Sequence, residues 1–279
     1  IHSIFDDKAR YAQYRLMLFA RPTQPASRSA DGTTETVKAV TPQSPKAAYD
    51  SMLQNDTVDI YVVGDIDVEE MTEKLRQVLA FGDRELHEKQ LKTEIDTKPE
   101  EYTKEQQEMK QGKLHIGFST PVYFGDPHFP KMQIFNGIFG GYAHSKLFMN
   151  VRERESLAYY ASSSYSSQYG LVFVTSGIEP SNEKKAIDVI NEQLKVMQNG
   201  EISDLELTQT KAMLTNQLKE ALDSARGQIE IYDQYKDLNE AFTIDTWASR
   251  WQQVTKEDVE QMAKQVKQEA IYFLCGKED

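Results

Sequence analysis

The stretch from residue 135 to residue 164 constrains the fold of this chain more than any other part of it. It reads as an apolar helix that ends at Gly140 and Gly141, then a second helix, then a strand rich in Tyr and Ser. The double glycine permits a sharp turn that residues with a Cβ atom would resist. Ser145 can cap the second helix, because a serine hydroxyl accepts hydrogen bonds from the first free N–H groups of a helix. The stretch therefore predicts a helix–turn–helix–strand unit.

Two side chains of this unit can take part in chemistry. Arg152 falls in the last turn of the second predicted helix, and Tyr159 opens the strand that follows it. This spacing brings one guanidinium group and one phenol to the same helix–strand junction. The same spacing also allows a purely structural arrangement, in which Arg152 pairs with Glu155 or another nearby acid while Tyr159 packs in the sheet.

Two helix–strand segments far apart in the chain repeat one pattern. Residues 41–64 and 255–276 each hold a capping threonine, a helix, an apolar strand and then a glycine, with the strands expected at 58–63 and from residue 271. Such a repeat is typical of duplicated domains, although helix–strand units are common enough to recur by chance. The mixture of helical and strand patterns predicts an α+β fold.

Dense charge separates the two halves of the chain. Between residues 85 and 112 apolar side chains are sparse among charged ones, which predicts a linker between domains. After it, an alternating apolar pattern predicts a half-buried strand. The capping boxes at 203–206 and 255–258 predict the starts of two further helices.

Composition limits the classes of function. The 279 residues carry 44 Asp and Glu against 32 Lys and Arg, a formal net charge of −12. Phosphate binding needs clustered basic residues, so we expect no nucleic-acid partner. A cationic or unstructured peptide is compatible with this charge, and so is ordinary solubility. The one cysteine, Cys275, lies in an apolar run typical of an inert strand residue.

No apolar stretch reaches membrane-spanning length and no signal peptide is visible. We therefore expect a cytoplasmic protein with no membrane partner. The first residues already follow helical spacing, with Ile4, Tyr11 and Leu18 in phase, and the chain begins without methionine. A start inside a helix suggests a fragment of a longer protein.

The 135–164 stretch resembles the second domain of insulinase/pitrilysin-type zinc peptidases, the inverzincins, which include mitochondrial processing peptidase. The resemblance is carried by Gly140-Gly141, Ser145-Lys-Leu-Phe, Arg152-Glu and Leu-Ala-Tyr159. Residues 4–12 also resemble the first-domain helix that lies downstream of the metal site in that family. The resemblance thus covers essentially the whole chain, and it is closest to bacterial paralogues, some of which lack the zinc motif.

The resemblance implies two related domains of mostly antiparallel sheet, with helices packed on one face. Residues 1–84 would be the C-terminal part of a first, incomplete α+β domain. Residues 85–112 would be the charged linker, and residues 113–279 would form a complete second α+β domain.

The resemblance also implies roles for particular residues. In the family, an Arg and a Tyr at this spacing face the zinc site from across a cleft, so Arg152 and Tyr159 are assigned to the transition-state and substrate side. A phenol and a guanidinium aimed at the developing oxyanion lower the barrier by preorganised electrostatics. Gly140, Gly141 and Ser145 are assigned to substrate binding. Many active relatives have Gly where this chain has Ser156, which bears on the turn that positions Tyr159.

The zinc motif of the family is His-x-x-Glu-His on a helix, in which two imidazoles bind the metal and the Glu activates water. None of the five histidines of this chain fits that spacing; they are His2, His87, His115, His128 and His144. We therefore predict no metal site and no cofactor in this chain. Zinc is expected only in a full-length relative or a partner subunit that carries the motif.

Two functions follow from the resemblance. The chain is either the C-terminal region of a zinc endopeptidase, which supplies the cleft wall, or part of a catalytically inactive paralogue. The second would act as a non-catalytic partner subunit or a peptide-binding scaffold. The expected partners are a peptide or unfolded polypeptide and a homologous subunit, in a homo- or heterodimer.

Overall fold

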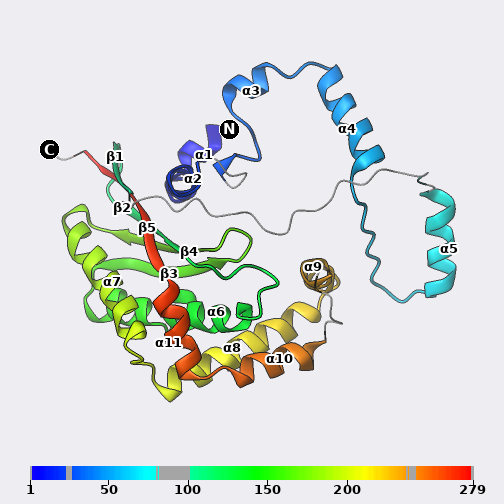
Figure 1. The fold of residues 1–279 in the computed structure, drawn as a ribbon. Coiled ribbons are helices and arrows are strands. Elements are labelled where there is room, and N and C mark those ends of the chain that lie inside the picture. The colour runs from blue at the N-terminus through cyan, green and yellow to red at the C-terminus, as the bar shows by residue number, and fades with distance from the viewer. Residues whose placement is uncertain are drawn as a thin grey trace. The chain divides into compact units, whose positions relative to one another are not determined.

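The computed structural model describes residues 2–22, 27–79, 81, 101–236, 238 and 243–277 (Figure 1). The α-helices in these ranges are α1 (His2–Asp6), α2 (Lys8–Ala20), α3 (Thr34–Lys38), α4 (Gln43–Asn55), α5 (Val68–Val78), α6 (Phe129–Asn136), α7 (Glu183–Gln198), α8 (Asp204–Leu222), α9 (Ala225–Tyr235), α10 (Ile244–Gln253) and α11 (Lys256–Gln265). Two π-helical segments, η2 (Gly137–Gly141) and η3 (Phe148–Arg154), and a 3₁₀ turn, η4 (Pro180–Asn182), join them. The strands are β1 (Glu101–Gln107), β2 (Gly112–Ser119), β3 (Ala158–Ser166), β4 (Leu171–Ile178) and β5 (Lys267–Gly276).

The chain forms two compact units. The first contains residues 1–31, 91–215 and 245–279, and the second contains residues 32–90 and 216–244. The predicted domain boundary near residue 84 lies outside the described residues, so it stays a prediction.

The first unit is built on a five-stranded mixed sheet with the order β1-β5-β2-β4-β3. β1 runs parallel to β5, and the other neighbouring strands are antiparallel. Helix α11 packs with α6 and α7 on one face of this sheet, whereas α2 packs on β2 and β5 (Figure 1). The α+β class predicted from the sequence is therefore confirmed.

Side chains of the central strands alternate between the two covered faces. Leu171, Phe173 and Tyr272 join the buried cluster under α2, while the buried residues between them in the chain, such as Val172 and Phe273, point to the opposite face. Strands that are covered on both sides become nearly continuous apolar runs. Helices were expected on one face of the sheet; α2, from the N-terminal segment, covers the other face as well.

Part of the predicted linker is a strand. Residues 101–107 form β1, which pairs with β5 from Glu101↔Ala270 to Gln107↔Gly276. The strand is poor in apolar residues because its side chains make polar contacts: Tyr102 donates to Glu183, and Glu105 accepts hydrogen bonds from Tyr11 and Tyr272. Residues 108–112 of the predicted linker lead from β1 into β2, which begins at Gly112. Residues 85–100, with His87, lie outside the described residues.

The second unit is helical in its described residues. Helices α4 and α5 bury none of their side chains, and residues 58–63, predicted as a strand, have no strand hydrogen bonding and are mostly exposed. A strand needs a neighbouring strand to pair with, and the described residues of this unit provide none. Tyr61 donates to Asp233, and Lys236 pairs with Asp59, which ties this segment to α9.

Two helix starts appear as the sequence predicted. Ser203 and Glu206 cap α8 reciprocally, with Ser203 N 2.8 Å from Glu206 Oε2 and Glu206 N 3.2 Å from Ser203 Oγ. Thr255 and Asp258 form the same capping box at α11. Among the described helices, none is both long enough and apolar enough to cross a lipid bilayer.

Candidate functional site

The segment that carries the predicted site runs from α6 through η2 and η3 into β3. Helix α6 passes directly into η2, where Gly140 is buried against β3. A Cβ atom on Gly140 would lie 2.6 Å from Ser163 N, so only glycine lets this turn approach the strand so closely. Neither Gly140 nor Gly141 has a positive φ. The double glycine therefore serves close packing, which corrects the expectation that it is needed for a sharp backbone turn.

Ser145 begins the next helical segment, as predicted. Its Oγ accepts a hydrogen bond from Phe148 N at 3.4 Å, and the residue is fully buried. Gly140 is buried too, whereas Gly141 is exposed. The substrate-binding role assigned to these three residues stays a prediction, and their observed contacts are structural.

Arg152 lies in η3 with a half-exposed side chain, 41% accessible. Its guanidinium carbon lies 4.6 Å from the centre of the Phe148 ring, a cation–π contact. Its Nε is 3.7 Å from the Glu153 carboxylate, at the outer limit of an ion pair. The structural alternative, a pairing of Arg152 with Glu155 or another nearby acid, is met by Glu153; Glu155 pairs with Lys185 at 2.8 Å instead.

Tyr159 stands at the start of β3 and is 58% exposed, so it does not pack in the sheet core. Its hydroxyl donates a hydrogen bond to the carboxylate of Glu179, at the end of β4. That carboxylate raises the pKa of the Tyr159 phenol above its ordinary value. We call Arg152 and Tyr159 the wall residues. Both face solvent, and each has its own acidic neighbour.

The turn before Tyr159 has an unusual backbone. Ser156 has a φ of 52°, and it is the one residue other than glycine with a positive φ in the described parts of the chain. This left-handed region favours glycine, since other residues pay a steric cost there. The position at which many active relatives have Gly is thus one that demands a glycine-like conformation, and here serine adopts it.

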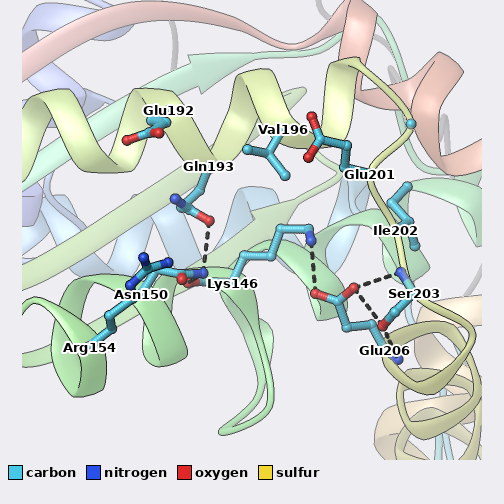
Figure 2. Close-up of a pocket in the computed structure, with 11 residues that line it drawn as sticks. Lys146, Asn150, Arg154, Glu192, Gln193, Val196, Glu201, Ile202, Ser203 and Glu206 are labelled. Carbon is cyan, nitrogen blue, oxygen red and sulfur yellow. Dashed lines mark hydrogen bonds and ion pairs between the residues drawn. The ribbon is translucent and has the colours of Figure 1, made fainter.

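An open pocket of about 560 Å³ lies between η3, α7 and the turn that leads into α8 (Figure 2). Its lining includes residues of η3, the segment that also carries Arg152. At its centre, the buried Lys146 ammonium lies 2.9 Å from Glu206. Burial alone would raise the pKa of the Glu206 carboxyl, but hydrogen bonds from Lys146 and Ser203 outweigh it and lower that pKa. Asn150 Nδ2 donates to Gln193 Oε1 at 2.8 Å across the pocket. We call this the η3–α7 pocket; neither Arg152 nor Tyr159 lines it.

The sequence did not reveal the acidic partners of Tyr159 and Lys146, which are Glu179 and Glu206. Glu179 is 20 positions from Tyr159, and Glu206 lies far along the chain from Lys146. The capping box identified Glu206 as a helix start, but no local signal reveals a partner in another element.

The described histidines do not supply a zinc site. His115 is buried, and neither ring nitrogen has a hydrogen-bond partner; His128 contacts Asp126, and His144 contacts Thr210. Zinc needs three or four such donors around one point. The part of the chain that the structure describes contains no group of three or more His, Cys, Asp or Glu side chains able to hold a metal. The zinc of the family therefore does not fit these residues.

Comparison with known proteins identifies the family to which the chain belongs. The peptidase M16 inactive domain matches residues 39–214. YmfF of Bacillus subtilis strain 168, a probable inactive metalloprotease, is 36% identical over 279 residues, which is 100% of this chain and 65% of the relative.

Two crystal structures are also similar. A conserved protein from Enterococcus faecalis V583 has a TM-score of 0.89 at 35% identity, covering 100% of this chain and 66% of that one. A peptidase M16 inactive domain from Pseudomonas fluorescens has a TM-score of 0.80 at 17% identity, covering 99% of this chain and 68% of that one.

The fold is that of an α+β chain, and its described residues lack a zinc ligand set. The chain belongs to the peptidase M16 family, because the family match covers more than half of it. The resemblance to insulinase/pitrilysin-type proteins is thereby confirmed. The chain spans 65% of the length of YmfF.

Proposed function

We propose that this chain supplies the peptide-binding wall of a catalytically silent M16 protein, which holds extended or unfolded polypeptides without cutting them. The observation that carries this proposal is the hydrogen bond from Tyr159 to Glu179. A phenol that stabilises a transition state must donate to the oxyanion as it forms. Here that donor is engaged by a carboxylate, whose negative charge opposes a second negative charge beside it.

Two further observations support a silent role. The guanidinium of Arg152 rests on Phe148 and lies near Glu153, so its positive charge is partly balanced within the wall. The relative that matches this chain from end to end is named a probable inactive metalloprotease. A homologous partner subunit and a cytoplasmic location complete the proposal; gel filtration and cell fractionation test them.

Binding of an unfolded polypeptide tests the proposal directly. The probe is fluorescently labelled α-lactalbumin that has been reduced and carboxymethylated. Its fluorescence anisotropy should rise when the chain is added, and the probe should stay intact on a gel. Tyr159→Ala should weaken this binding severalfold. The matched control is Tyr102→Ala, because Tyr102 is 52% exposed and also donates to a glutamate, Glu183. Equal effects of the two substitutions, or no binding by the wild type, would contradict the proposal.

A second function is favoured by the exposure of both wall residues. Exposed Arg152 and Tyr159 side chains could contact a substrate held by a partner that carries His-x-x-Glu-His, provided that the substrate replaces Glu179 as the acceptor of the Tyr159 hydroxyl. In such an active assembly, Tyr159→Phe should lower turnover by about 100-fold or more, because that is the loss typical of removing one oxyanion donor. Folding should not change, and Tyr102→Phe should leave turnover unaffected. An unchanged rate for Tyr159→Phe would assign Tyr159 a structural role only.

A further inference from the structure

The η3–α7 pocket shares no lining residue with the wall residues Arg152 and Tyr159. Its volume of about 560 Å³ lies in the range of roughly 300–1,000 Å³ that is typical of small-molecule pockets. Segments of the first unit line it: Lys146 and η3, α7, the turn before α8, and Glu206 in the first turn of α8. The pocket is open to solvent, so a small ligand can enter without any rearrangement of the fold.

Charged side chains line the pocket at its centre and at both ends. At its centre, Lys146 and Glu206 form an ion pair with each other, so together they add little net charge to the pocket. Arg154 and Asn150 lie together at one end, whereas Glu201 lies at the other end (Figure 2). Within the described residues, Arg154 and Glu201 form no ion pair or side-chain hydrogen bond, and both are exposed. Each can therefore bind a ligand group without breaking a contact of the protein.

An apolar surface contributes to the lining beside these charged groups. Val196 is half-buried and Ile202 is buried, 5% exposed, and both line the pocket. A ligand that satisfies the lining has a carboxylate for Arg154, an ammonium group for Glu201, and a small apolar body between them. Arg154 suits a carboxylate because a guanidinium binds it through two parallel hydrogen bonds.

Glu192 makes it possible to test which end of the ligand, carboxylate or ammonium, lies beside Arg154. It lines the pocket from α7, at the end where Arg154 lies (Figure 2). Its negative charge repels a carboxylate bound by Arg154, and it would attract an ammonium group placed there instead. Removal of this charge therefore changes the affinity in opposite directions for the two orientations.

We propose that the η3–α7 pocket binds the free zwitterionic form of a short peptide with small side chains, with its carboxylate on Arg154 and its ammonium on Glu201. Such peptides are released when polypeptides are degraded, so the pocket would sense or hold degradation products. The site shares no residue with the wall, and its test does not depend on the proposed function.

The probe is trialanine, titrated into the intact chain by isothermal calorimetry. Arg154→Gln and Glu201→Gln should each weaken binding by about tenfold, the loss expected for one hydrogen bond to a charged group. Glu192→Gln should strengthen binding, because it removes the negative charge that repels the peptide carboxylate. The control is Lys195→Gln, an exposed cation on α7 that does not line the pocket, and it should have no effect. N-acetyl-trialanine and trialanine amide should each bind about tenfold more weakly than trialanine.

Several results would overturn the proposal. No binding at millimolar trialanine, or equal binding of the blocked peptides, would remove the zwitterion as ligand. Weaker binding of the Glu192→Gln variant would reverse the orientation. Tyr159→Phe should leave trialanine binding unchanged; a loss there would mean that the peptide binds at the wall instead.

Discussion

The buried imidazole of His115 predicts a specific dependence of stability on pH. His115 lies on β2, 1% exposed, and neither ring nitrogen has a hydrogen-bond partner. Burial, together with the nearby charge of Lys113, lowers the pKa of His115 from 6.5 to about 4. The folded chain thus keeps this ring neutral at pH values where the unfolded chain protonates it.

The sign and size of the effect follow from proton linkage. Between pH 6.5 and pH 4 the unfolded state binds more protons at this site than the folded state, so the free energy of unfolding falls as the pH falls. At about 1.4 kcal/mol per pH unit, the loss between pH 8 and pH 5 is about 2 kcal/mol. His115→Leu removes the titrating group at similar volume and should lose about 2 kcal/mol less over this range than the wild type.

Urea denaturation at pH 8 and pH 5 measures this difference. The fluorescence of Trp247 and Trp251 reports on the first unit, since both rings are buried there. Carboxyl groups that titrate in the same range are common to both proteins and cancel in the comparison. Ile116→Val is the control, because it perturbs the same strand without a titrating group. If His115→Leu follows the wild-type pH dependence, the assignment of a depressed pKa to His115 is wrong.

Three further substitutions test the packing around the site and the sheet. Ser156→Gly should raise the free energy of unfolding by about 1 kcal/mol, because glycine adopts the positive φ without steric cost; a lower melting temperature would count against this. Gly140→Ala should cost about 1–3 kcal/mol, since its Cβ would meet Ser163 N at 2.6 Å, and a neutral result in urea would show that the turn can move. Arg21→Met should cost about 3–5 kcal/mol, because it leaves the buried Glu269 unpaired. The double variant with Glu269→Leu should recover most of that loss, and additive losses would contradict the pairing.

The sequence predicted those features of the fold that are encoded locally. The capping boxes at Ser203 and Thr255 start α8 and α11 as expected, because a cap depends on residues only three positions apart. The junction of helix and strand that carries Arg152 and Tyr159 was also predicted from local spacing.

Features that depend on distant residues escaped prediction. β1 looked like a linker because its polar side chains are satisfied by α7 and α2, through Glu183 and Tyr11. Residues 58–63 have the pattern of a strand, but a pattern alone cannot supply a neighbouring strand. The engagement of Tyr159 by Glu179 required the register of β3 on β4, which no short-range signal encodes.

The central claim is that this chain binds polypeptide but does not hold the metal that would cut it. The most direct test measures two properties of the purified chain. Elemental analysis gives its zinc content, and a quenched fluorogenic peptide, with and without chelator, reports any cleavage. The account predicts substoichiometric zinc and no chelator-sensitive cleavage, alongside saturable binding of the unfolded polypeptide. One zinc per chain with cleavage that chelator abolishes would contradict it.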